Sequence, residues 1–251
     1  MPQYGLIGYP LSHSFSQKYF SEKFSKLHLD DCSYLNFEID AIEKLNDVIN
    51  EHPDLKGFNV TIPYKETVIK FLNELDEIAT EVGAVNTVKV FKVDEKRILR
   101  GYNTDVFGFE ESLKPLLKQH HKAALILGTG GASKAIAYVL KKLNISFQFV
   151  SRVKFKTILG YNDLNESAIN NHQLIINTTP LGSFPDVENA PQIPFQYLNS
   201  NHLCYDLIYN PEETLFLKKA KEQGAEIKNG FEMLKLQAER AYEIWTETKK
   251  L

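Results

Sequence analysis

The sequence has few of the residues that disulfide-rich, metal-binding and membrane proteins require. It holds only 2 cysteines in 251 residues, Cys32 and Cys204, which lie far apart and have no neighbouring cysteine. This excludes a disulfide framework or a zinc cluster, and no histidine pair has the HExxH spacing, so no metal site is predicted. The longest apolar runs have the length of a strand and are too short to cross a bilayer. The first residues, MPQYGLIGYP, do not resemble a signal peptide, so we expect a cytoplasmic protein.

The chain also lacks a strong charge of one sign. Its 29 basic and 32 acidic residues give a net charge of −3, which predicts no broad basic surface for nucleic acid. A hydrophobic fraction of 43% is typical of a globular domain, and the length suffices for one large domain or two small ones. We therefore expect a small-molecule partner rather than nucleic acid or a membrane. Monomer and homodimer both stay open.

The most informative stretch is residues 123–134, AALILGTGGASK. An apolar run ends in Gly128, Gly130 and Gly131, and a helical apolar pattern follows, so the stretch predicts a buried parallel strand, a tight turn and a helix. Glycines allow close approach of a phosphate, and the helix N-terminus offers free N–H groups to it. Ser133 stands where a third glycine is usual in a dinucleotide site. An ordinary glycine-rich turn of an α/β domain is the alternative interpretation.

The segments before this stretch predict alternating strands and helices. Strands are expected at 4–7, 35–39, 57–62 and 83–88, with 97–99 paired beside the last. Helices are expected after the turn at 11–16, with apolar positions from 19 to 27, and at 42–49 and 67–75. This alternation is typical of parallel βαβ units, whose ligands gather at the carboxyl ends of strands. Asn59, Thr61 and Lys65 follow such a strand, although an isolated lysine there is usually only exposed to solvent. Ser14 and Ser16 precede a helix, where they either cap it or hold a small carboxylate.

The strand expected at 145–150 ends in two cations, Arg152 and Lys154. A protein that binds NAD normally has a carboxylate at this position for the ribose hydroxyls, whereas a guanidinium grips a 2′-phosphate. The cations therefore predict NADP, with a pair of solvated charges as the alternative. Near the C-terminus, Gln237 falls within the apolar face of the last helix. A buried amide needs partners, so it indicates either a ligand contact or a bond to backbone.

Taken together, the chain resembles the shikimate dehydrogenase family. The resemblance lies in a series of segments in the family's order and approximate spacing: SHSFS, NVTIPYK, GAVNT, GYNTD, GTGGAS, NTTPLG, YDLIYNP and NGFEMLKLQA. It implies an α/β protein of two lobes, an N-terminal α/β substrate-binding domain (1–103 plus 231–251) and a Rossmann-like NADP-binding domain (104–230). The implied reaction is the reversible NADPH-dependent reduction of 3-dehydroshikimate to shikimate, in the biosynthesis of aromatic amino acids.

The resemblance also implies roles for individual residues. Lys65 and Asp105 match the catalytic pair. Residues that match the substrate site are Ser14, Ser16, Asn59, Thr61, Asn86, Tyr209 and Gln237. Residues assigned to the NADP site are Gly128, Thr129, Gly130, Gly131, Ala132, Ser133, Arg152, Lys154, Asn177, Thr178 and Gly230. Ser151 and Val153 depart from the family pattern, which has Asn and Thr around the arginine.

These residue types suit ketone reduction by a nicotinamide. The cofactor carries the hydride, and an ammonium beside the ketone oxygen protonates it and stabilises its developing charge. Lys65 is our candidate for the acid and Asp105 for the group that orients it, although which of the two transfers the proton stays open. The alternatives are a quinate or dual quinate/shikimate dehydrogenase and a catalytically silent ligand sensor. A folate-linked dehydrogenase is disfavoured by the serine motif and GYNTD.

Overall fold

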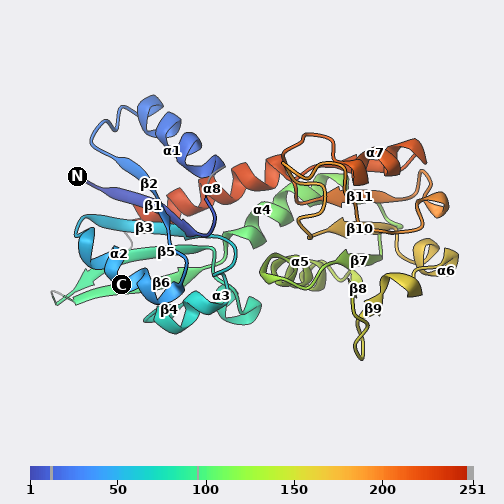
Figure 1. Cartoon of the computed structure of the whole chain (residues 1–251), viewed down its shortest axis with the longest axis horizontal. Helices are drawn as coiled ribbons and strands as arrows, with labels where there is room; N and C mark the ends of the chain where they lie inside the picture. Colours follow the sequence, from blue (N-terminus) through green and yellow to red (C-terminus); the bar gives the residue numbers. More distant parts are fainter. Residues whose placement is uncertain (12–13, 95, 248–251) are drawn as a thin grey trace. The chain divides into compact units, whose positions relative to one another are not determined.

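A computed structural model of the chain describes residues 1–11, 14–94 and 96–247 (Figure 1). The chain divides into two compact units. The first comprises Met1–Thr104 and Ala238–Leu251, and the second comprises Asp105–Gln237. Within the described residues each unit has a six-stranded β-sheet with helices packed on it, which confirms the predicted α/β fold class.

The sheet of the first unit is mixed, with strand order β2-β1-β3-β5-β6-β4. Its strands are β1 Gln3–Gly8, β2 Ser33–Glu38, β3 Leu55–Val60, β4 Glu74–Leu75, β5 Thr87–Val93 and β6 Lys96–Tyr102. The first three strands are parallel, while β5 runs antiparallel to both β3 and β6. The predicted pairing of 97–99 beside the preceding strand is confirmed, since Leu99 lies opposite Val90.

Alternation along β1 explains how both faces of this sheet are covered. Tyr4 and Leu6 point to one face, where they pack with the aromatic residues of α1 (Phe15–Lys26) and with Trp245 of α8 (Phe231–Thr246). Ile7 points to the other face and packs with Leu45 of α2 (Leu45–Glu51). Because successive side chains of a strand alternate between faces, one short strand contributes to two cores.

The prediction of a helix at 67–75 is wrong. This segment forms a short 3₁₀ helix, η2 (Thr67–Phe71), and then strand β4, which pairs in parallel with Arg100 and Gly101 of β6. The true α-helix of the region is α3 (Glu77–Val82), which the Asp76 side chain caps by accepting from Ala79 N at 2.7 Å. Strand pairing with a distant segment therefore overrides the local helical pattern.

The sheet of the second unit is entirely parallel, in the order β12-β11-β10-β7-β8-β9. Its strands are β7 Ala123–Leu127, β8 Ser146–Ser151, β9 Leu159–Gly160, β10 Leu174–Asn177, β11 Leu203–Asp206 and β12 Glu226–Lys228. Its helices are α4 Thr104–Leu113, α5 Gly131–Lys142, α6 Glu166–Asn170 and α7 Leu215–Glu222. The central strands are buried and almost wholly apolar, as a parallel sheet covered on both faces requires.

Helix α8 is shared by the two units along its sequence, because it begins in the second unit and its residues from Ala238 onward belong to the first. Further 3₁₀ turns are η1 Ile42–Lys44, η3 Lys114–Leu116, η4 Tyr161–Asp163 and η5 Phe195–Tyr197. None of the described helices is long and apolar enough to cross a membrane.

Candidate active site

Ser14 directly precedes helix α1, and its hydroxyl does not form the capping bond that this position allows. Ser14 is the N-cap residue in extended backbone, yet its side chain makes no capping hydrogen bond. Its Oγ is buried and has no hydrogen-bond partner among the described residues. A buried polar atom left unpaired costs about 1–3 kcal/mol, which a ligand that accepts its hydrogen would recover. This favours the ligand interpretation of the serines over capping.

Asn59, near the end of β3, is enclosed by hydrogen bonds. Its Nδ2 donates to the Asn86 carbonyl oxygen at 3.2 Å and to Thr87 Oγ1 at 3.1 Å. Its Oδ1 accepts from the Tyr34 hydroxyl at 2.8 Å. Because Asn59 is also buried, its amide is held in a single orientation beside Asn86.

The N-terminus of α4 is held by Asn86, which belongs to a different segment. Asn86 Oδ1 accepts from Thr104 N at 2.7 Å and from Thr104 Oγ1 at 3.1 Å. Asp105, the next residue, is buried in the first turn of α4, where the helix dipole stabilises a carboxylate. Asp105, predicted to orient the catalytic lysine, therefore directly follows a backbone group that Asn86 anchors.

Lys65 lies in the turn that follows β3, and its backbone is fixed. Its carbonyl oxygen accepts from Val85 N at 2.7 Å. The preceding Tyr64 buries its ring and donates its hydroxyl to a backbone oxygen at 2.7 Å. Lys65 and Thr104 are thus anchored to consecutive residues, Val85 and Asn86, of one short segment.

In the second unit, the glycine loop has the form expected of a phosphate site. Gly128 has a φ of +111°, and a Cβ at this position would lie 2.7 Å from Thr178 Oγ1, so only glycine fits. Gly130 is the N-cap of α5, and the first turn of α5 has no acidic residue to occupy its free N–H groups. Ser133, at the third-glycine position, is buried and donates its hydroxyl to the Gly130 oxygen at 2.6 Å. Thr129 is exposed, while Gly131 and Ala132 open the helix.

The two cations after β8 differ in their surroundings. Arg152 is exposed and follows a strand that pairs with β7, the strand that leads into the glycine loop. Lys154 forms an ion pair with Asp163 Oδ1 at 2.9 Å. The hydrogen bond from Lys154, followed by one from Gly160 N, lowers the pKa of Asp163. Arg152 is therefore the stronger candidate for a 2′-phosphate.

The end of β10, which carries the predicted residues Asn177 and Thr178, is joined to β11 through Asp206, which the sequence did not predict. Asn177 is fully buried, and its Nδ2 donates to Asp206 Oδ1 at 3.0 Å, while its Oδ1 accepts from Thr179 N at 3.0 Å. Thr178 Oγ1 donates to the Leu127 oxygen at 2.7 Å, at the start of the glycine loop. Asn177 thus holds the loop that follows β10, and Thr178 ties that loop to the end of β7.

Asp206 predicts a pH dependence of stability. Burial raises its pKa from 3.8 to about 6, against hydrogen bonds from Thr214, Ile208 N and Asn177. Because the folded state binds this proton more tightly than the unfolded state, its contribution to stability grows as the pH falls from about 6 towards 4. We expect the free energy of unfolding of wild type minus that of Asp206→Asn to rise by about 2 kcal/mol between pH 7 and pH 4.5. Urea titrations at the two pH values measure it, and an unchanged difference contradicts it.

The other predicted residues lie near the ends of strands, just before α8, or within it. Thr61 N donates to the Ile7 oxygen at 2.9 Å, and Gln237 Nε2 donates to the Leu234 oxygen at 3.0 Å. Tyr209 is half-buried, and burial raises its pKa. A Cβ on Gly230 would lie 2.0 Å from the Leu207 oxygen, so the start of α8 requires glycine.

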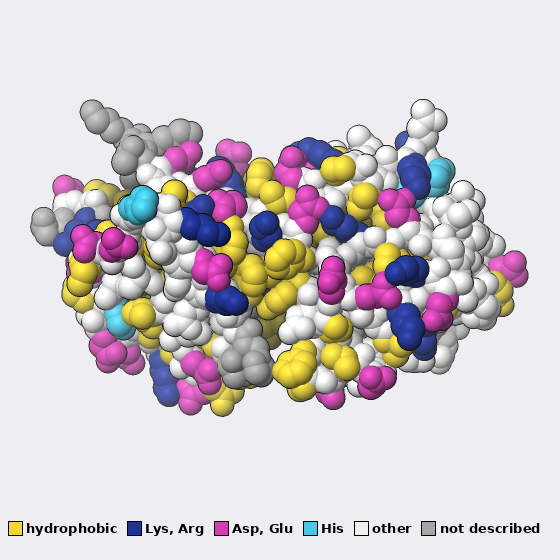
Figure 2. Space-filling view, turned by 90° about the horizontal axis from the view of Figure 1, so that it is seen from above, with side chains coloured by type: hydrophobic (Ala, Val, Ile, Leu, Met, Phe, Trp, Pro, Cys, Tyr) yellow, Lys and Arg dark blue, Asp and Glu magenta, His cyan; other side chains and the backbone are white. Residues whose placement is uncertain are grey.

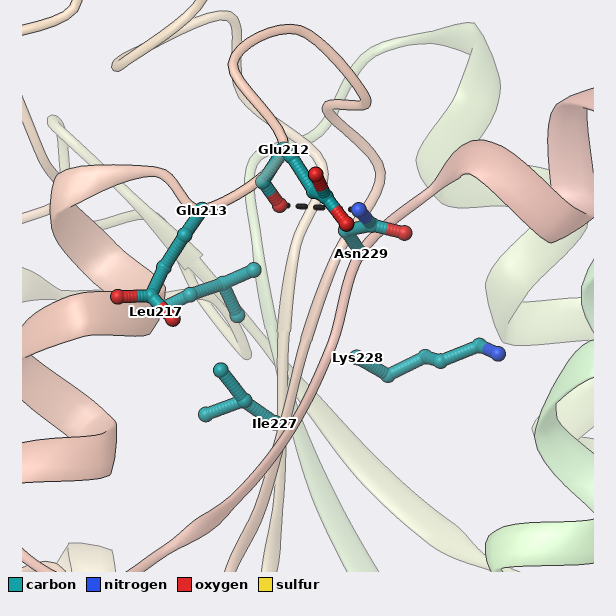
Figure 3. Close-up of a pocket in the computed structure, with 6 residues that line it drawn as sticks. All are labelled: Glu212, Glu213, Leu217, Ile227, Lys228 and Asn229. Carbon is teal, nitrogen blue, oxygen red and sulfur yellow. Dashed lines mark hydrogen bonds between the residues drawn. The ribbon is translucent and has the colours of Figure 1, made fainter.

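A cavity of about 440 Å³ lies elsewhere in the second unit (Figure 3). It is lined by Glu212, Glu213, Leu217, Ile227, Lys228 and Asn229, none of which was predicted as a site residue. Beside this cavity, Asn229 Nδ2 donates to the backbone oxygen of Glu212 at 2.9 Å. Two glutamates beside it would repel a pyrophosphate, so we do not assign the cofactor to this cavity.

Sequence reasoning missed Asp206 and Tyr34. An acid at the end of an otherwise apolar strand is a signal that could have indicated a buried carboxylate at Asp206. Tyr34 directly precedes the strand predicted at 35–39, and nothing local shows that its hydroxyl meets Asn59. Such contacts depend on which strands become neighbours.

The two units together define a class of protein. A parallel sheet with a glycine loop, an open helix N-terminus and a cation on the neighbouring strand is the architecture of a dinucleotide-dependent oxidoreductase. The first unit adds a lysine and buried amides and hydroxyls at strand ends, which suit a polar small molecule.

Comparison with known proteins identifies the family. Residues 6–88 match the model of the shikimate dehydrogenase substrate binding domain. The NADP(+) shikimate dehydrogenase of Methanococcus aeolicus is 38% identical, over 98% of this chain and 92% of its own length. A shikimate dehydrogenase structure in complex with NADP+ superposes with a TM-score of 0.85 at 34% identity, covering 98% of this chain and 90% of that one. The Thermus thermophilus enzyme in complex with NADP(H) and shikimate gives 0.84 at 29% identity, with 98% and 94% covered. The chain therefore belongs to the shikimate dehydrogenase family, as its motifs predicted.

Proposed function

We propose that this chain catalyses the reversible NADPH-dependent reduction of 3-dehydroshikimate to shikimate, in the biosynthesis of aromatic amino acids. The observation that carries the proposal is the match to an NADP(+) shikimate dehydrogenase over 98% of the chain. We further propose that 1–103 with 231–251 binds the substrate and that 104–230 binds NADP.

Lys65 and Asp105 are the proposed catalytic pair. When bound, NADPH supplies a hydride to the ketone carbon. The Lys65 ammonium then donates a proton to the oxygen and stabilises the charge that develops there. Asp105, buried at the dipole-stabilised start of α4, orients the lysine and the same hydroxyl. The backbone anchoring of Lys65 to Val85 and of Thr104 to Asn86 supports fixed positions for both groups.

The carboxylate of the substrate is assigned to the start of α1. Ser14 Oγ is buried and unpartnered among the described residues, which suits a hydroxyl that donates to a bound carboxylate. Ser16 is also assigned to the substrate carboxylate. Ring hydroxyls are assigned to the remaining predicted residues: Asn59, Thr61, Asn86, Tyr209 and Gln237.

The cofactor is assigned to the loop 128–133, with Thr178, Gly230 and Arg152 around it. Gly128 gives the close approach, and the open N-terminus of α5 receives the pyrophosphate. Asn177 supports this site indirectly. Its amide is fully buried and accepts a hydrogen bond from Thr179 N, which fixes the loop after β10. Lys154 contributes positive charge next to Arg152 while paired with Asp163.

Arg152 gives a test of the cofactor assignment. Arg152→Gln is expected to raise KM for NADP+ about 10- to 100-fold, the worth of one charge-assisted contact to a phosphate, and to leave KM for NAD+ unchanged. Lys154→Ala is the matched control, and we expect a smaller effect because Lys154 already has a carboxylate partner. Initial rates with both cofactors measure this. Equal losses with NADP+ and NAD+ would rule out a 2′-phosphate contact.

The function itself is tested by spectrophotometric NADP+ reduction with shikimate and quinate in parallel. We expect turnover with shikimate and NADP+. Faster turnover of quinate would identify the quinate alternative, and shikimate binding without turnover would identify a ligand sensor.

We propose small molecules as the partners of the chain, which acts in the cytoplasm as a monomer or homodimer. On the face seen in Figure 2, basic and acidic side chains are interspersed rather than gathered by sign, which does not suit nucleic acid. Size-exclusion chromatography with light scattering distinguishes a 28.7 kDa monomer from its dimer.

A further inference from the structure

Tyr34 places a buried hydroxyl against Asn59, one of the residues assigned to the substrate. It lies on β2, is only 3% exposed, and stacks its ring on Phe20 with centroids 4.6 Å apart. Its Oη donates to Asn59 Oδ1 at 2.8 Å. Tyr34 lies on β2 and Asn59 on β3, so one hydrogen bond joins two strands that are separate in the sequence.

The hydroxyl has a fixed role in this arrangement. Burial raises the pKa of Tyr34, so the phenol keeps its hydrogen and always presents a donor to Asn59. Its single hydrogen is used on Asn59. The buried hydroxyl therefore positions Asn59.

The consequence falls on the orientation of Asn59. An asparagine amide has two different ends, and the Tyr34 donor selects the oxygen end. The nitrogen end then donates to the Asn86 oxygen and to Thr87 Oγ1, and Thr87 Oγ1 lies 3.1 Å from Thr104 Oγ1. The chain of hydrogen bonds thus continues from Tyr34 to the residue that begins α4.

We propose that Tyr34 is a positioning residue that sets the orientation of Asn59, and with it the contacts to the hydroxyl-bearing ring of the substrate. The proposal rests on the proposed function. Loss of the phenol leaves Asn59 Oδ1 buried without its donor.

The test is Tyr34→Phe, which removes one oxygen and keeps the ring. We expect KM for shikimate to rise about 5- to 10-fold, because the buried Asn59 oxygen loses its hydrogen-bond donor. The values of kcat and of KM for NADP+ should stay within about twofold of wild type. Tyr4→Phe is the matched control. Tyr4 belongs to the same aromatic cluster and stacks on Trp245, but its hydroxyl has no hydrogen-bond partner within the described part of the chain. We expect wild-type kinetics from it.

A double mutant shows whether Tyr34 acts through Asn59. In an Asn59→Ala background, Tyr34→Phe should raise KM for shikimate no further. A similar rise in both backgrounds, or an unchanged KM in Tyr34→Phe whose circular dichroism melt confirms folding, overturns the proposal. Failure of the proposed function is a distinct result, because wild type itself would then not reduce NADP+ with shikimate.

Discussion

Replacement of Lys65 with alanine is expected to lower kcat for shikimate oxidation about 10²- to 10⁴-fold, the usual contribution of a positioned acid or base. KM should change far less, because a group that acts on the developing oxyanion stabilises the transition state more than the bound ground state. Steady-state kinetics of NADP+ reduction measures both constants. A large rise in KM with kcat intact would make Lys65 a binding residue.

Two further variants show whether the loss is specific. Lys70→Ala removes an exposed ammonium five residues further along the same segment and should leave kcat unchanged. Lys65→Arg retains the positive charge, but a guanidinium does not release its proton at any working pH. We therefore expect Lys65→Arg to be as impaired as Lys65→Ala. Substantial activity in Lys65→Arg would show that Lys65 supplies charge alone and would make Asp105 the proton donor.

The sequence predicted well those features that depend on a few neighbouring residues. The glycine turn is one case, because a positive φ at Gly128 and a close approach to Thr178 leave no choice of residue. The strand that precedes it is another, since burial on both faces requires an all-apolar run. The position of Arg152 directly after a strand that pairs with β7 was also predicted, while its contact with a 2′-phosphate stays a prediction.

Features that depend on long-range pairing were not predicted. The pattern at 67–75 favoured a helix because pairing of Glu74 with Arg100 cannot be read from local spacing. The start of α4 is held by Asn86, which is 18 residues away in the chain, and not only by the residues of its own turn. Tyr34 and Asp206 gain their roles only when β2, β3, β10 and β11 are assembled.

Replacement of Trp245 with alanine is expected to destabilise the first unit by about 3–5 kcal/mol, the cost of truncating a large buried aromatic side chain. Trp245 is 5% exposed, stacks on Tyr4 with centroids 5.0 Å apart, and donates its indole N–H to the Val88 oxygen at 2.9 Å. Through these two contacts it packs and hydrogen-bonds the end of α8 to the sheet. Urea unfolding followed by circular dichroism measures the loss, and Trp245→Phe, which keeps an aromatic ring, should lose less. Equal losses in the two variants would contradict the packing argument.

The reason for this cost lies in a match between Trp245 and a glycine on β3. A Cβ added to Gly57 would lie 2.2 Å from Trp245 Cδ1 and 2.8 Å from the Val88 oxygen, so the indole occupies the space that a side chain would need. Gly57→Ala should then destabilise wild type by about 1–3 kcal/mol through overpacking. In the Trp245→Ala background the indole is gone and only the contact with Val88 persists, so the same substitution should cost less. The double-mutant cycle should therefore show coupling of at least about 0.5 kcal/mol, and strict additivity would show that Gly57 is needed for its backbone rather than for the indole.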